Sequence, residues 1–110
     1  MKLEPGVVIL LKIDFHQAEG SKVRPAVVLF DSGDDDFMAA PITSRRREIE
    51  YDLESRSWRA AGLNVPSFIR VHKLTVLAKS AVRRNLNRLA DSDCQALRRV
   101  LARMFFPAGA

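Results

Sequence analysis

The chain has 110 residues, 47% of them hydrophobic, and a formal net charge of +5. This length can bury one hydrophobic core and is too short for two, so we expect one domain over residues 1–110. No stretch approaches the roughly 20 apolar residues of a membrane span, and no signal-peptide pattern is present, which predicts a cytoplasmic protein without a membrane partner. The single cysteine, Cys94, excludes an internal disulfide and argues against structural zinc.

The positive charge comes mostly from arginine, which outnumbers lysine 13 to 5. Arginine makes bidentate contacts with phosphate and stacks on bases, so nucleic acid is the first partner class to consider. Solvated arginines on a small domain, or an acidic protein partner, would explain the same charge. The charge alone therefore leaves the partner open.

The first half of the chain predicts three strands separated by polar loops. Apolar runs place these strands at residues 7–13, 25–30 and 37–43. The first run is apolar nearly throughout, so we expect it to be covered on both faces. The polar loop over residues 14–23 contains Glu19 and Lys22. The acidic turn over residues 31–36 lacks the ligand spacing of a calcium-binding loop, and we expect a solvated hairpin turn there.

The second half predicts short strands and then a helix. Apolar and acidic residues alternate over residues 49–54, which predicts a strand with one solvated, acidic face. Further short apolar segments occupy residues 67–71, 74–77 and 82–89. Ser92 and Gln95 have capping-box spacing before an amphipathic helix that ends ahead of Pro107. These elements indicate a mainly β fold, a small barrel or curled sheet, with a C-terminal α-helix.

Arg24 stands at the entrance of the second predicted strand, directly before Pro25. Proline fixes its own φ and restricts the preceding residue to extended geometry, so the guanidinium is presented from stiff backbone. A stiffly held cation suits an anionic ligand. Taken alone, the stretch favours the simpler explanation of an arginine that keeps a strand end soluble.

Polar side chains also gather where other predicted strands meet loops. Thr43 and Ser44 end the third strand, and Arg70 and His72 lie on one face of the strand that starts at residue 67. These residue types suit metal-free cleavage of RNA. That reaction needs a base for the 2'-hydroxyl proton, an acid for the departing 5'-oxygen and donors for the phosphate charge. We therefore predict neither a metal nor a cofactor.

Each of these side chains can fill a role in such a reaction. A histidine titrates near neutral pH, so His72 can act as acid or base, with Glu19 as a reserve base. Arg24 and Arg70 can hold phosphate oxygens, and Thr43 can donate a hydrogen bond. A surface histidine beside a strand end and a threonine that shapes a turn are the structural alternatives.

Other residues are candidates for contacts with RNA. Trp58 lies between two arginines in a predicted loop, where bases can stack on it. An exposed tryptophan is also common at the rim of a core or at a subunit contact. The predicted RNA-binding residues are Glu19, Lys22, Ser44, Arg45, Arg46 and Trp58.

Three motifs in order carry a family resemblance. They are KVRPAVVL at residues 22–29, APITS at residues 40–44 and PSFIRVHKL at residues 66–74. With these motifs the chain resembles the MazF/PemK family of toxins from type II toxin-antitoxin modules. The order and spacing match along nearly the whole chain, and the three motifs together are more specific than any one of them.

The resemblance implies an SH3-like β-barrel with a C-terminal helix, a homodimer, and an acidic antitoxin as partner. It also implies an endoribonuclease that cuts single-stranded RNA to 2',3'-cyclic phosphate and 5'-hydroxyl ends. The family's catalytic arginine falls on Arg24, its threonine on Thr43 and a further arginine on Arg70. His72 stands where some members have an acidic residue. The alternatives are a toxin of the same fold that acts on a protein such as DNA gyrase, and a plain RNA-binding barrel.

Overall fold

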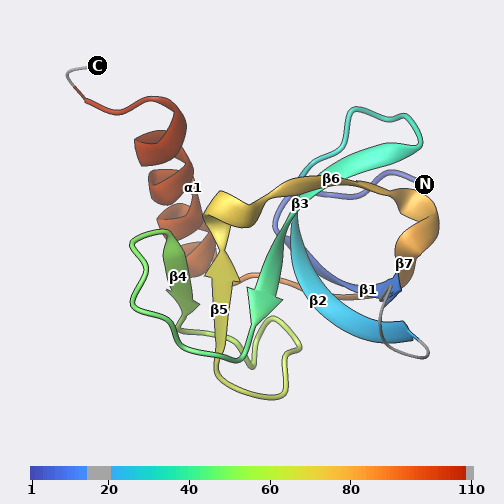
Figure 1. Cartoon of the computed structure of the whole chain (residues 1–110), viewed down its shortest axis with the longest axis horizontal. Helices are drawn as coiled ribbons and strands as arrows, with labels where there is room; N and C mark the ends of the chain where they lie inside the picture. Colours follow the sequence, from blue (N-terminus) through green and yellow to red (C-terminus); the bar gives the residue numbers. More distant parts are fainter. Residues whose placement is uncertain (15–20, 109–110) are drawn as a thin grey trace.

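The fold is a bent antiparallel sheet with one long helix beside it (Figure 1). The computed structural model describes residues 1–14 and 21–108. Its strands are β1 (Val7–Asp14), β2 (Ser21–Phe30), β3 (Asp36–Thr43), β4 (Asp52–Ser55), β5 (Ser67–Arg70), β6 (Thr75–Ala78) and β7 (Val82–Arg88). The helices are two short 3₁₀ turns, η1 (Val71–Lys73) and η2 (Lys79–Ala81), and α1 (Asp91–Phe105). None of the helices in this described part is long and apolar enough to cross a membrane.

The strands run in the order β4-β5-β3-β2-β1-β7, and β6 pairs with β3. All of these pairings are antiparallel. Figure 1 shows β1 and β2 curving around one side of the molecule, whereas α1 stands beside β4 and β5 on the other. The end strands β4 and β7 are not neighbours in this order, so the sheet is curled but not closed. The predicted mainly β fold with a C-terminal helix is confirmed.

β1 is apolar on both faces, and both of its faces are covered. Val8 and Ile9 follow each other in β1, and both are fully buried in two different clusters. One cluster joins the sheet to α1 through residues such as Ile69 and Leu97. The other contains Ile9 together with Phe37 of β3. The prediction that the first strand is covered on both faces is confirmed.

β2 begins earlier than predicted, at Ser21, because it continues as a hairpin partner of β1. Arg24 and Pro25 therefore lie inside a strand instead of at its entrance. The pairing of β2 with β3 ends at Ala26 and Pro41. Pro25 lies just beyond that ladder, which is a position where a residue without an N–H is tolerated.

The strand with the predicted acidic face is shorter than expected and only partly solvated. Glu50 and Glu54 are exposed, as predicted. The Asp52 side chain, however, is only 1% exposed, and Asp52 pairs with Arg70 across β4 and β5. The prediction of a solvated acidic face is wrong at this position, because alternation along one strand does not reveal what the neighbouring strand places against it.

α1 begins one residue before the predicted cap, so the capping-box prediction is wrong. Its N-cap position is Ala90, which makes no side-chain cap hydrogen bond, and Ser92 lies within the first turn. The buried Asp93 carboxylate instead accepts hydrogen bonds from the Ser55 hydroxyl at 2.9 Å and from the backbone N–H of Arg56 at 3.2 Å. The first turn of the helix is thus bound to the end of β4.

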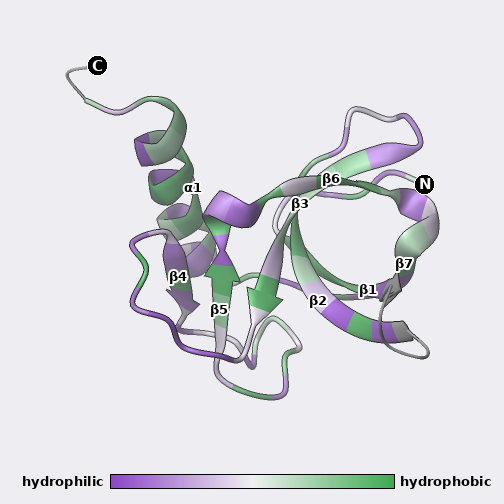
Figure 2. Ribbon diagram, in the orientation of Figure 1, coloured by the Kyte–Doolittle hydropathy of each residue, from purple (hydrophilic) through white to green (hydrophobic). Residues whose placement is uncertain are grey.

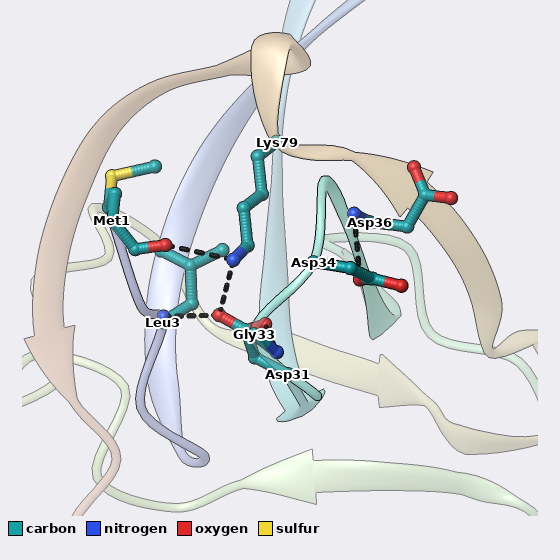
Figure 3. Close-up of polar contacts among 7 residues, drawn as sticks. All are labelled: Met1, Leu3, Asp31, Gly33, Asp34, Asp36 and Lys79. Atoms are coloured by element: carbon teal, nitrogen blue, oxygen red, sulfur yellow. Dashed lines mark hydrogen bonds and ion pairs between the residues drawn. The ribbon is translucent and has the colours of Figure 1, made fainter.

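The acidic turn after β2 is solvated except for its first residue. Asp31 is buried and accepts hydrogen bonds from the backbone N–H of Leu3 at 2.6 Å and of Gly33 at 2.8 Å (Figure 3). The Lys79 ammonium lies 3.0 Å from the same carboxylate and also donates to the carbonyl oxygen of Met1. These donors, first among them the Leu3 N–H, lower the pKa of Asp31 from 3.8 to about 2. The Asp31 carboxylate thus links the N-terminal residues to the sheet.

Candidate functional site

A cavity of about 990 Å³ opens where β2, β3 and β5 come together. Its lining includes Arg24 from β2, Thr43 from the end of β3, Ser44 and Arg45 from the following loop, and Arg70 from β5. Three segments that are far apart in the sequence therefore meet at one opening. The loop between β3 and β4, which forms one side of it, is hydrophilic over most of its length (Figure 2).

The antiparallel register explains why Arg24 and Thr43 line the same cavity. Ala26 of β2 pairs with Pro41 of β3, and both line the cavity. Arg24 and Thr43 lie two residues further along their strands, in opposite chain directions. Since side chains two residues apart share a face of a strand, both point to the side on which Ala26 and Pro41 lie. The ladder itself ends at Ala26 and Pro41, and Arg24 and Thr43 lie beyond it on adjacent strands that line one cavity.

Thr43 has a structural contact in addition to its place in the cavity. Its Oγ1 accepts a hydrogen bond from the backbone N–H of Arg45 at 3.1 Å, which shapes the turn after β3. Thr43 therefore does shape a turn, which is the structural alternative to a role in catalysis. A hydroxyl group has a proton and a second lone pair besides, so Thr43 can still donate to a ligand in the cavity.

Arg70 is paired with a buried carboxylate. Its Nε lies 3.3 Å from Asp52 Oδ1, and the two side chains are 19% and 1% exposed. In the described residues its Nη nitrogens make no hydrogen bond or ion pair. Because a guanidinium has five N–H donors in a fixed plane, one edge can rest on Asp52 while the other faces a ligand.

His72 does not line the cavity. It lies on η1, because β5 ends at Arg70 and the strand alternation that would place the two side chains on one face stops there. Its Nδ1 is buried, has no hydrogen-bond partner in the described part of the chain, and lies 3.8 Å from Asp52 Oδ1. His72 and Arg70 nevertheless converge, on the Asp52 carboxylate.

The predicted RNA-binding residues divide into two groups. Ser44 and Arg45 line the cavity, whereas Lys22, Arg46 and Trp58 do not. The structure does not describe Glu19, which lies outside the described residues.

The residues outside the cavity have contacts of their own. Arg46 donates to Glu54 at 2.7 Å, and its guanidinium lies 4.9 Å from the centroid of the Phe68 ring. Trp58 is half-buried, with the Arg59 guanidinium 4.7 Å from its ring centroid. An arginine thus already occupies a face of Trp58.

Two lining arginines were not singled out from the sequence, Arg47 and Arg84. Arg47 Nη1 is buried and lacks a hydrogen-bond partner in the described residues. In the sequence, Arg47 stands out only as part of the run of three arginines after Ser44. Such a run has no periodicity, so it does not predict which of the three side chains is buried. Arg84 pairs with Leu10 across β7 and β1, a pairing that cannot be inferred from either strand alone.

The electrostatic character of the cavity follows from its lining. Among the described residues it is lined by five arginines, Arg24, Arg45, Arg47, Arg70 and Arg84, and by no aspartate or glutamate. Like charges that face one opening raise its positive potential and attract an anion. Planar guanidinium groups fit phosphate and carboxylate in particular.

Comparisons with solved structures find the same fold. The Mycobacterium tuberculosis toxin MazF-mt6 matches with a TM-score of 0.73 at 21% identity, over 93% of this chain and 96% of that chain. A MazE-MazF structure from Deinococcus radiodurans matches with a TM-score of 0.76 at 18% identity, over 94% and 96%. An endoribonuclease in complex with its cognate antitoxin, from a mycobacterial species, matches with a TM-score of 0.69 at 13% identity, over 91% of each chain. A comparison with curated protein sequences found no match.

The sequence itself matches a family profile. The profile describes PemK-like, MazF-like toxins of type II toxin-antitoxin systems and covers residues 4–105. The matched region contains the three motifs and all of the residues that line the cavity. The chain therefore belongs to the family of PemK-like and MazF-like toxins of type II toxin-antitoxin systems.

Proposed function

We propose that this toxin is a metal-independent endoribonuclease that cuts single-stranded RNA, acting in the cytoplasm. The observation that carries the proposal is the lining of the cavity, which combines five arginines with the Thr43 hydroxyl and contains no carboxylate among the described residues. A surface that served only to bind a protein would not need an arginine and a hydroxyl that line one cavity from adjacent strands. Membership in the toxin family supports the same conclusion.

The proposed reaction is an attack within the RNA chain. The 2'-oxygen forms a bond to the neighbouring phosphorus as the bond from phosphorus to the 5'-oxygen breaks. A base takes the 2'-hydroxyl proton and an acid gives a proton to the departing 5'-oxygen, which leaves a 2',3'-cyclic phosphate and a 5'-hydroxyl. Arg24 and Arg70 stabilise the charge that builds on the phosphate oxygens, and Thr43 donates a hydrogen bond to one of them.

His72 and Glu19 are the proposed proton-transfer groups. His72 does not line the cavity, but it follows Arg70, which does, by two residues. Glu19 precedes β2 in the sequence and lies outside the residues that the structure describes. The dependence of the reaction rate on pH distinguishes a group that transfers a proton from one that has only a structural role.

An acidic antitoxin is the proposed protein partner, and a homodimer the proposed assembly. The opening that attracts RNA phosphates also attracts the carboxylates of an extended acidic peptide, so such a peptide would compete with RNA. Two of the similar solved structures are a MazE-MazF structure and an endoribonuclease with its cognate antitoxin, which supports the proposal.

The proposed function is tested with purified protein and a single-stranded RNA in EDTA. We expect cleavage to continue without divalent metal, to stop when the 2'-hydroxyl at the cut site is replaced by hydrogen, and to leave cyclic phosphate ends. Cleavage of the 2'-deoxy substrate at the same site would contradict the proposed chemistry. RNA that is bound with steep salt dependence but stays intact would indicate a plain RNA-binding protein. Growth arrest without RNA cleavage would indicate a protein target such as DNA gyrase.

A further inference from the structure

Asp52 is a buried carboxylate without a role in the reaction described above. Its side chain is 1% exposed, and Asp52 does not line the cavity, whereas its partner Arg70 does. β4 and β5 pair Asp52 with Arg70, and its Oδ1 lies 3.3 Å from Arg70 Nε. A buried carboxylate is unfavourable unless a cation compensates its charge. Separating Asp52 from Arg70 therefore costs more free energy than separating an exposed ion pair.

The same carboxylate faces a second basic group. His72 Nδ1 lies 3.8 Å from Asp52 Oδ1. Both His72 Nδ1 and Asp52 Oδ2 are buried without a hydrogen-bond partner in the described residues. The 3.8 Å separation is too long for a hydrogen bond, so Arg70 is the only side chain that donates to Asp52 among the described residues. The backbone N–H of Val71 donates to the carbonyl oxygen of Tyr51 at 3.0 Å, which fixes η1 beside the start of β4.

We propose that Asp52 is a positioning residue for the reaction: it anchors Arg70 through Nε, so that the Nη edge faces the scissile phosphate. The inference rests on the proposed function, because it assumes that Arg70 contacts phosphate. An anchored guanidinium loses little rotational freedom when it binds phosphate, whereas a free one must first be ordered. Removing the anchor therefore slows the chemical step more than it weakens RNA binding.

A double-mutant cycle tests the coupling directly. Asp52→Ala and Arg70→Ala are each expected to lower kcat about 10- to 100-fold, with a smaller change in KM. If Asp52 acts through Arg70, the double variant cuts no more slowly than Arg70→Ala alone. Asp52→Asn, which keeps an acceptor oxygen, restores part of the lost rate. Losses that multiply in the double variant would overturn the proposal.

The matched control is Glu50→Gln. Glu50 is an exposed carboxylate two residues before Asp52, so the variant makes the same change of charge nearby. We expect its kcat to stay within about twofold of the unmodified protein. A loss equal to that of Asp52→Asn would mean that the effect comes from net charge, and would overturn the positioning role.

A second readout does not depend on RNA cleavage. In ¹⁵N NMR spectra the Arg70 Nε–H is expected to exchange slowly with solvent in the unmodified protein and in Glu50→Gln, and to lose that protection in Asp52→Ala. If Asp52→Ala does not fold, as judged by circular dichroism, Asp52→Asn takes its place in both experiments and is expected to show a smaller loss. Unchanged protection would overturn the anchoring. If the unmodified protein cuts no RNA, the proposed function fails while this measurement still decides whether Asp52 anchors Arg70.

Discussion

Replacing Asp93 with alanine is expected to detach the first turn of α1 from β4. Asp93 is 3% exposed and accepts hydrogen bonds from the Ser55 hydroxyl at 2.9 Å, the Arg56 N–H at 3.2 Å and the Ser57 N–H at 3.1 Å. The substitution leaves one buried and two partly buried donors without an acceptor. An unsatisfied buried donor costs about 1–3 kcal/mol and an ordinary hydrogen bond contributes about 0.5–1.5 kcal/mol. The expected loss in the free energy of unfolding is therefore about 2–6 kcal/mol.

Urea denaturation followed by circular dichroism measures this loss, and Asp91→Ala is the matched control. Asp91 lies in the same turn, but its side chain is 89% exposed and its only described partner is Arg88 at 3.4 Å. An exposed ion pair contributes at most about 1 kcal/mol, so the control should lose no more than that. Asp93→Asn, which keeps an acceptor oxygen, should lose less than Asp93→Ala. Equal losses in Asp93→Ala and Asp91→Ala would refute the anchoring of the helix by Asp93.

Three further predictions concern Asp31, Arg47 and His72. The pKa of Asp31 is lowered from 3.8 to about 2 in the folded chain, so its contribution to the free energy of unfolding is complete above pH 3.8 and is lost as the pH falls toward 2. Urea titrations of Asp31→Asn should therefore show a shallower pH dependence in that window than the unmodified protein, and an unchanged slope would contradict the assignment. Arg47→Ala should weaken RNA binding and reduce the slope of log K against log salt by about 0.7, measured by fluorescence anisotropy, whereas Arg103→Ala, an exposed arginine at the end of α1, should leave the slope unchanged. If His72 takes part in proton transfer, His72→Ala should change the shape of the profile of cleavage rate against pH, and an unchanged profile would remove it from that role.

Much of the fold could be predicted because the apolar periodicity is strong. The runs that became β1 and β3 and the helical spacing that became α1 are local signals, and burial on both faces of β1 follows from its composition. The pairing of the strands with one another could not be predicted. The extension of β2 to Ser21 depends on its partner β1, and the cover over Asp52 depends on Arg70 in β5.

The candidate site was only partly predictable for the same reason. Arg24, Thr43 and Arg70 carry motif signals, and the structure brings all three to one cavity. Arg47 and Asp52 carry no motif signal. Arg47 turns inward from an aperiodic loop, and Asp52 lies in an alternating stretch that favours exposure.

The central claim is that the arginine-lined cavity cuts RNA, and the rate of a single turnover tests it most directly. Arg24→Ala should lower the rate of cleavage of a bound single-stranded RNA in EDTA by about 10²–10³-fold, because it removes a donor to the charge that builds on the phosphate. Arg99→Ala, which removes an exposed arginine of α1 that does not line the cavity, should cut at a rate within about twofold of the unmodified protein. Unchanged cleavage by Arg24→Ala would contradict the account.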